Sequence, residues 1–427
     1  MSRPARRAAR RAAPLRPGPG PEPGPALRFG FRFPDRPAPA ARPVRALLLL
    51  VLALLVPSAG CTGRPADAPR AKAEAEAEVR RAVADWAAGG GGRPAGVPLE
   101  SWAYEVRSVR VTVTDAGTGA TAGADLRYRL AGHDGAPAGG ARELTLAERD
   151  GHWRVEADRP APGALPELWD QGPVEAVRGR YALVLGTGPR ERLTGIAAAA
   201  DAAVPAVAAA WPSGPPGTSG GTPWSGRAVL LVPGSADRMA ALLGSAPGAY
   251  RGMAAVTTGR VGASPAPADR VVVNPDAYAE LGEEGRRIVL THEITHVATR
   301  PVTSASTPMW LSEGLADWVA YRGSGRTPPD IAPATARAVR TGRVPAALPA
   351  NGAFAFGGDQ EALSRAYEES WLACRTIAAR WGEQALLRLY TAAAREPLPE
   401  ALSHTLHTDL PTLTTAWQQS LRTDLPD

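Results

Sequence analysis

Residues 289–320 read VLTHEITHVATRPVTSASTPMWLSEGLADWVA, and the interpretation of the whole chain depends on this stretch. Its first half contains His292, Glu293 and His296 with the spacing H-E-x-x-H. Apolar residues recur at helical intervals between residues 283 and 300, so we expect an amphipathic helix there. Residues four apart on a helix lie on one face, which lets both imidazole rings bind one metal ion.

Zinc is the metal that this spacing favours. Imidazole nitrogens bind Zn²⁺ at about 2.0–2.1 Å, and a carboxylate between two such ligands faces the metal-bound water. Glu293 can take a proton as that water attacks a carbonyl and then return it to the leaving amine. The pattern therefore predicts one Zn²⁺ ion and peptide-bond hydrolysis with Glu293 as general base. The alternative is a helix face with two ordinarily hydrogen-bonded histidines.

The second half of the stretch bears on the third ligand. No H-x-x-G-x-x-H extension follows the motif, which excludes the metzincin type. A second helix is expected after Thr307-Pro308, an N-cap followed by proline. Its W-L-S-E-G-L-A-D segment resembles the W-L-N-E-G-F-A segment of the aminopeptidase N-like gluzincins, in the peptidase MA clan. That resemblance, which spans roughly residues 179–427, implies that Glu313 is the third zinc ligand. The gap after His296 is shorter than in the best-known gluzincins and affects only the connecting loop.

Asp317 is assigned a supporting role on the same basis. It follows Glu313 by four residues and so shares its helix face. Thermolysin-like relatives have an aspartate at this offset, and metal-bound histidines usually donate their second N–H to a carboxylate. We therefore expect Asp317 to accept a hydrogen bond from His292 or His296. The alternative is an acid on a helix surface.

Tyr367 is the candidate for stabilising the oxyanion of the transition state. The aminopeptidase N-like family uses a tyrosine some sixty residues after the ligand glutamate, and Tyr367 follows Glu313 by fifty-four. Tyr321 and His404 are the reserve candidates, and the alternative for Tyr367 is a tyrosine packed in a helical core. The G-A-M-E-N segment that binds a free α-amine in aminopeptidases is missing, so endo- and exopeptidase activity both stay open.

The N-terminal segment predicts export from the cytoplasm. Eleven apolar residues, 46–56, follow a basic segment, and this length suits a signal peptide better than a membrane span of about 20 residues. The sequence P-S-A-G-C that ends at Cys61 resembles a bacterial lipobox. The resemblance implies a lipoprotein with a lipid anchor on Cys61, on the outer face of the bacterial cell membrane. Secretion after cleavage near Ala59 or Gly60 is the alternative.

The charge distribution gives no support for nucleic-acid binding. The chain has a formal net charge of +6, but residues 1–45 contain eleven arginines and two acids, which leaves about −3 for the remainder. Residues 1–43 are expected to be disordered, unless translation starts downstream of them. A lipidated Cys61 would leave Cys374 as a free, buried thiol, whereas a disulfide between the two is the formal alternative.

The periodicity of the chain predicts an α+β protein. A helix at 71–88 followed by four alternating segments, separated by Gly/Asp turns, weakly resembles the NTF2-like fold. Strands that alternate with helices, followed by helices alone, match the layout of a gluzincin metallopeptidase. We expect a basic tail with signal peptide over residues 1–60 and a tether over 61–70. An NTF2-like α+β domain over 71–157, a linker over 158–178 and a gluzincin-like domain over 179–427 follow.

Two functions are compatible with these features. The first is an extracytoplasmic zinc metallopeptidase, a hydrolase that acts on peptides or proteins. The second is a non-catalytic cell-surface binding lipoprotein that retains a zinc site. Glu293 favours the enzyme, because a purely structural zinc site would not need a base beside the metal.

Overall fold

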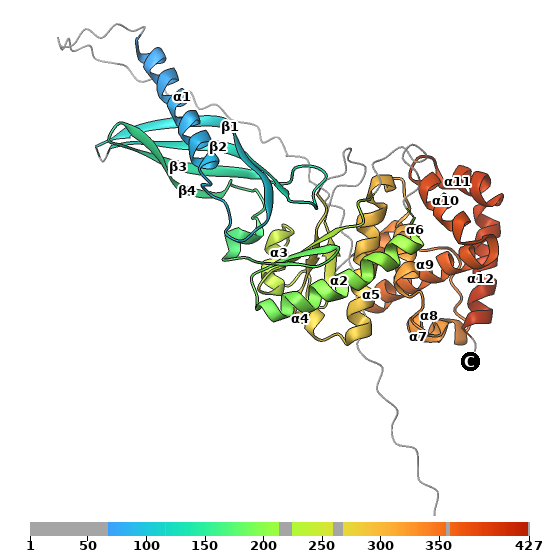
Figure 1. Ribbon diagram of the computed structural model, residues 1–427. Helices are drawn as coiled ribbons and strands as arrows, with labels where there is room; N and C mark the ends of the chain where they lie inside the picture. The colour runs from blue at the N-terminus through green and yellow to red at the C-terminus, as the bar shows by residue number, and fades with distance from the viewer. Residues whose placement is uncertain (1–66, 116, 213–223, 259–267, 356–358, 426–427) are drawn as a thin grey trace, which may run out of the picture.

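The computed structural model describes residues 67–115, 117–212, 224–258, 268–355 and 359–425. The expected basic tail, signal peptide and lipid-anchored Cys61 lie outside these residues. The described part contains both helices and sheets and belongs to the α+β class, as the sequence predicts. Figure 1 shows a sheet-rich N-terminal unit at one end of the molecule and a helical region at the other.

The N-terminal unit is one helix on a four-stranded antiparallel sheet of order β1-β2-β3-β4. Val79 and Val83 of the helix pack on alternate sheet residues such as Ala122 and Leu144, because a strand turns every second side chain to the same face. This burial explains why the helix and all four strands can be predicted from periodicity. The elements are α1 (Asp67–Ala88), β1 (Leu99–Thr114), β2 (Gly117–Leu130), β3 (Ala141–Arg149) and β4 (His152–Pro160).

The second unit is built on a five-stranded mixed sheet of order β5-β6-β7-β9-β8. Strands β6, β7 and β9 are parallel, and an antiparallel strand flanks them on each side. The strands are β5 (Glu175–Arg178), β6 (Ala182–Gly186), β7 (Ala228–Val232), β8 (Ala255–Thr257) and β9 (Val271–Val273). Strand β8 is therefore an edge strand, with one side of its backbone left unpaired by this sheet.

Strand β5 corrects one expectation. It lies within the segment 158–178 that we predict as a linker, and it pairs with β6 over four residues. Only Val177 of this strand is buried, so the segment has too little alternation to be recognised. The pairing supplies partners for the outer backbone groups of β6, which the burial of that strand requires.

Both faces of the second sheet are covered. The helices α2 (Arg190–Ala210) and α5 (Glu283–Thr299) pack on one face, and α3 (Ala236–Leu242) packs on the other. The second face also meets the N-terminal unit, because Leu183 and Leu185 share a core with Trp102 and Leu130. The two units are thus joined by a common apolar core instead of a simple tether.

Helix α2 is the one described helix that is long and apolar enough to cross a membrane. Its buried side chains, among them Leu193, Ile196 and Val204, belong to the core beneath the second sheet. The position of α2 against that sheet and α5 accounts for its apolar composition.

The remaining helices follow the metal-binding stretch or connect the strands. Helix α9 begins at Gln360, because Asp359 caps it by accepting a hydrogen bond from the Glu361 N–H. Helix α11 is not expected from the sequence. Cys374 is a free and buried thiol in α9, as expected. The elements are η1 (Leu168–Gln171), α4 (Pro275–Ala279), η2 (Arg300–Val302), α6 (Met309–Ala320), α7 (Pro328–Ile331), α8 (Pro333–Arg340), η3 (Asn351–Phe354), α9 (Gln360–Trp381), α10 (Glu383–Ala393), α11 (Leu398–Leu406) and α12 (Leu410–Asp424).

Candidate metal centre

Helices α5 and α6 carry the predicted ligands and run in opposite directions. Arg287 donates to the Ala320 carbonyl, His292 contacts Asp317, and His296 contacts Glu313. The partner numbers fall on α6 as they rise on α5, which is the signature of antiparallel packing. Every residue of α6 is buried, so its polar side chains must find partners on neighbouring elements.

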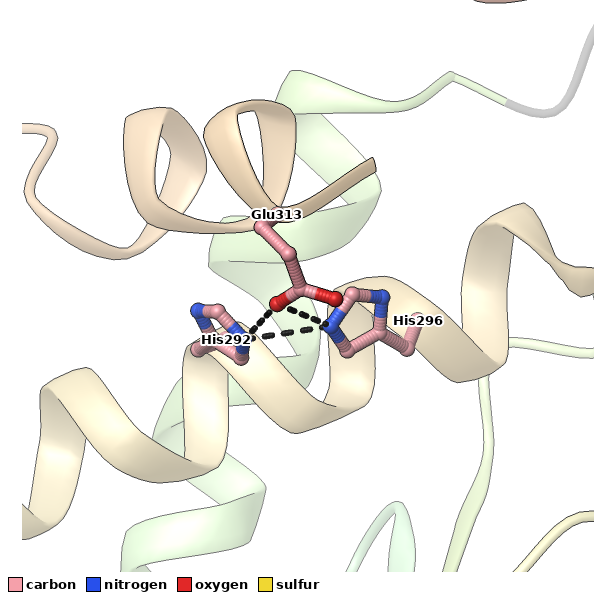
Figure 2. A group of neighbouring side chains, drawn as sticks. All are labelled: His292, His296 and Glu313. Atoms are coloured by element: carbon pink, nitrogen blue, oxygen red, sulfur yellow. Dashed lines mark hydrogen bonds and ion pairs between the residues drawn. The ribbon is translucent and has the colours of Figure 1, made fainter. Parts of the chain in front are cut away.

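Three donor atoms meet between these helices. Nε2 of His292 lies 3.1 Å from Nε2 of His296, and Oε2 of Glu313 lies 3.3 and 3.4 Å from these two nitrogens. Figure 2 shows the three side chains converging from the two helices. Their exposed fractions are 0%, 3% and 0%, so water hardly reaches them. The structure therefore brings His292, His296 and Glu313 together as a buried group that can hold a metal ion.

The carboxylate of Glu313 supports this interpretation. Neither of its oxygens has a hydrogen-bond partner among the described residues, although Oε2 is within ion-pair distance of both histidines. A buried carboxylate without hydrogen bonds costs several kcal/mol unless a cation compensates it. The donor set of two imidazoles and one carboxylate thus fits a divalent metal ion.

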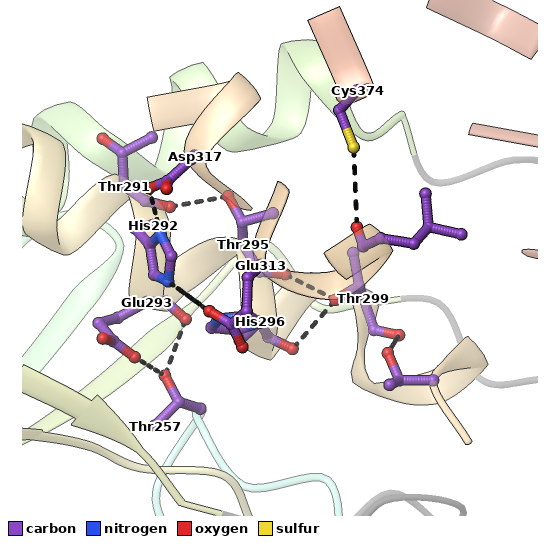
Figure 3. Close-up of polar contacts among 12 residues, drawn as sticks. Thr257, Thr291, His292, Glu293, Thr295, His296, Thr299, Glu313, Asp317 and Cys374 are labelled. Atoms are coloured by element: carbon purple, nitrogen blue, oxygen red, sulfur yellow. Dashed lines mark hydrogen bonds and ion pairs between the residues drawn. The ribbon is translucent and has the colours of Figure 1, made fainter. Parts of the chain in front are cut away.

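Asp317 fixes the orientation of one histidine. Its Oδ1 lies 2.8 Å from Nδ1 of His292, and Asp317 is buried. Figure 3 shows this contact between the two side chains. A carboxylate accepts at this distance, so Nδ1 carries the proton and Nε2 is left to bind a metal. The sequence leaves open whether His292 or His296 pairs with Asp317, and in the structure the partner is His292.

The charges of the site shift the pKa values of its members in opposite directions. Burial alone would lower the pKa of His292, but Asp317 and Glu313 outweigh it and raise this pKa to about 10. Burial would raise the pKa of Glu313, yet the two histidines hold it at about 2. The pKa of Glu293 is raised, chiefly because its carboxyl group is buried. The donors thus form a charged cluster without a metal, in which Glu313 is ionised.

Glu293 lies beside the donor group and is not part of it. Its side chain reaches toward β8, where Thr257 donates a hydrogen bond to Oε2 at 2.6 Å. Its Oε1 has no hydrogen-bond partner among the described residues. Thr257 is not predicted from the sequence, since a threonine in a short buried strand has no pattern that links it to a residue 36 positions away.

The candidates for oxyanion stabilisation are placed differently. The ring of Tyr367 lies 6.5 Å from the ring of His292 and 5.4 Å from that of Phe354. Tyr321 stacks edge-on against Trp371 at 6.0 Å. His404 is an exposed residue of α11 that pairs with Glu396, so it does not belong to this buried site. Of these three candidates, Tyr367 is the one whose ring lies beside His292.

Gly314 is a second feature without a predicted role. A side-chain carbon at this position would lie 2.3 Å from the Ser370 carbonyl oxygen and 2.8 Å from Sγ of Cys374. Helix α9 therefore approaches α6 closely at the residue after Glu313, which only glycine permits. The glycine in the W-L-S-E-G segment is the sequence signal from which this close approach of two helices could be inferred.

No protein-family model matches this chain, and no curated protein is significantly similar to it.

Proposed function

We propose that this protein is a zinc metallopeptidase of the gluzincin type, with His292, His296 and Glu313 as the metal ligands. Zinc–ligand bonds of about 2.0–2.1 Å in a tetrahedron place neighbouring ligand atoms about 3.3–3.4 Å apart. The donor atoms here are separated by 3.1, 3.3 and 3.4 Å. This agreement is the observation that carries the proposal.

The residues around the ligands have distinct roles in the proposed reaction. Bound zinc would act as a Lewis acid and lower the pKa of a coordinated water. Glu293 accepts a proton from the attacking water and delivers it to the leaving amine, for which a buried carboxyl group of raised pKa is suited. Asp317 keeps Nδ1 of His292 protonated and the ring correctly oriented.

Tyr367 is the proposed donor to the oxyanion. Its ring lies beside that of His292, and the residue is 7% exposed, on the side of the site formed by α9. A phenol O–H in a water-poor site is an effective donor to a developing negative charge. On this proposal, Tyr367 acts on the substrate and Glu293 on the water.

The substrate and location follow from the proposed chemistry and the N-terminal sequence. We propose that the protein acts on peptides or proteins outside the cytoplasm, held on the outer face of the bacterial membrane through a lipid on Cys61. The residues after 45 carry a mildly acidic net charge, which does not favour binding to nucleic acids.

One observation favours the second candidate, a binding lipoprotein with a closed zinc site. The ligands are almost completely enclosed, and structural zinc sites lack an open position for substrate. Such a site has no use for a buried glutamate beside the ligands, and Glu293 is fully buried there without being a ligand. The two candidates differ in whether Glu293 is needed.

Hydrolysis of a quenched peptide library by the full chain in mild detergent, with Zn²⁺, tests the proposal. Glu293→Gln should abolish hydrolysis and still take up one zinc ion, as measured by elemental analysis. Glu283→Gln is the matched control, because Glu283 is an exposed acid in the first turn of the same helix. Failure to bind zinc, or equal hydrolysis by wild type and Glu293→Gln, would overturn the proposal.

A further inference from the structure

We propose that Thr257 is a positioning residue for Glu293. Its hydrogen bond to Oε2 leaves Oε1 of Glu293 as the oxygen that exchanges the proton with the attacking water. This inference rests on the proposed function. Thr257 ends the edge strand β8 and is 1% exposed. Its hydroxyl lies 2.6 Å from Oε2 of Glu293 and 3.0 Å from the carbonyl oxygen of the same residue. Figure 3 shows both contacts.

The chemistry of a hydroxyl group decides between these two acceptors. Thr257 has one proton to donate, and a carboxylate oxygen is the stronger and here the closer acceptor. Oε2 of Glu293 is therefore occupied, and the rotation of the carboxyl group is fixed. Oε1 has no hydrogen-bond partner among the described residues, so it is the oxygen available to a water molecule.

Strand β8 is held firmly enough to position a side chain. Thr257 pairs with Val271 in the antiparallel register of β8 and β9. The next residue, Thr258, donates its N–H to the Arg270 carbonyl at 2.7 Å, and its hydroxyl accepts from the Arg270 N–H at 3.1 Å. The backbone on both sides of Thr257 is thus tied to β9.

Hydrogen bonds also connect the residues beside β8 and β9 to the C-terminal end of helix α5. Arg300, which follows α5, donates to Asp269 at 3.1 Å and to the Thr258 carbonyl at 3.3 Å. Side-chain exposures of Arg300 and Asp269 are 2% and 5%. Because buried charge pairs have narrow geometry, the segment beside Thr257 is held against the C-terminal end of α5.

Steady-state kinetics of the zinc-loaded full chain test the positioning role. Thr257→Val removes the hydroxyl at nearly constant volume and should lower kcat about 10- to 100-fold, the loss expected for a hydrogen bond to a charged group. KM should change less than about threefold. Thr257→Ser, which restores the hydroxyl, should recover most of kcat. Unchanged or increased kcat in Thr257→Val would overturn the inference.

Thr295→Val is the matched control for these measurements. Thr295 is equally buried, on α5 between the two histidines, and its hydroxyl donates only to the Thr291 carbonyl of its own helix. The same substitution there should leave kcat within about twofold and zinc content at one ion per chain. A fall in kcat equal to that of Thr257→Val would mean that any buried hydroxyl loss has this effect and would overturn the inference.

Unfolding of the metal-free protein gives a readout that is independent of activity. Thr257→Val should raise the unfolding equilibrium constant about tenfold in the wild-type background and by a clearly smaller factor in Glu293→Leu, where the hydroxyl keeps only the backbone carbonyl as acceptor. Equal increases in both backgrounds would show that the hydroxyl serves only the Glu293 carbonyl, against the inference. An inactive wild type would overturn the proposed function, while this cycle would still decide the Thr257–Glu293 contact.

Discussion

Asp134 and Arg270 form a bidentate ion pair between the two units, with nitrogen–oxygen distances of 2.6 and 2.8 Å. Asp134 lies in the loop after β2, and Arg270 directly precedes β9. The two side chains are 1% and 7% exposed, and Asp134 also accepts the Leu130 N–H. This ion pair thus joins the N-terminal unit to the second sheet. It lies beside the edge strand β8, whose Thr257 contacts Glu293.

The first prediction concerns this pair. Asp134→Asn removes the carboxylate that pairs with the buried Arg270 guanidinium, which should destabilise the protein by about 3–5 kcal/mol. Urea unfolding followed by tryptophan fluorescence measures the change. Arg149→Gln is the control, because Arg149 pairs with Glu156 on the exposed face of the N-terminal sheet, and it should cost less than about 1 kcal/mol. Comparable losses for both variants would contradict the prediction.

The second prediction separates a metal ligand from a residue that orients one. Glu313→Gln removes the only anionic donor and should prevent stoichiometric zinc binding. Asp317→Asn should retain zinc with about 10- to 100-fold weaker affinity, because the Nδ1 proton of His292 loses its charged acceptor. Competition with a chromophoric chelator measures both constants. Equal affinities of Asp317→Asn and wild type would disprove the orienting role.

The third prediction is a pH dependence of metal uptake. The two Nε2 atoms lie 3.1 Å apart, a hydrogen-bond distance that needs a proton on one of them. The carboxylates raise the pKa of His292 to about 10, which keeps it protonated at neutral pH. Zinc must displace this proton, so affinity should rise about tenfold per pH unit from pH 6 to 8, well below that pKa. Calorimetry in two buffers of different ionisation enthalpy should reveal about one released proton, and identical heats would refute it.

The fourth prediction concerns helix packing behind the ligand. Gly314→Ala places a methyl group 2.3 Å from the Ser370 carbonyl oxygen, so α6 and α9 must separate. We expect a destabilisation of about 1–3 kcal/mol and weaker zinc binding, because Glu313 moves with α6. Differential scanning calorimetry with and without zinc measures both effects. Gly195→Ala is a suitable control, since a methyl group at this α2 position meets no atom within 4 Å.

Part of the metal site can be predicted because its signal is local. His292 and His296 are one helical turn apart, so helical periodicity alone places them on one face. Glu313 and Asp317 also share a helix face, but their roles are implied by the resemblance of the W-L-S-E-G-L-A-D segment and not by periodicity. The α+β class follows in the same way from alternation in β1 to β4 and from the apolar helices after β9.

The contacts between distant segments could not be predicted. Thr257 reaches Glu293 across 36 residues, and Asp134 reaches Arg270 across 136. Neither member of a pair carries a pattern that identifies its partner, because sheet order and domain docking determine which residues meet. Strand β5 cannot be predicted for a related reason, since its place beside β6 depends on pairing more than on its own four residues.

The apolar core that joins the two units limits how this chain can be divided or recombined. A cut after residue 178 would separate β5 from β6 and leave Leu183, Leu185 and Val229 without the Trp102 and Leu130 side chains that cover them. The isolated second half would then present a contiguous apolar surface, which favours aggregation. Exchange of the N-terminal unit for another module would therefore require a matching apolar face on the replacement.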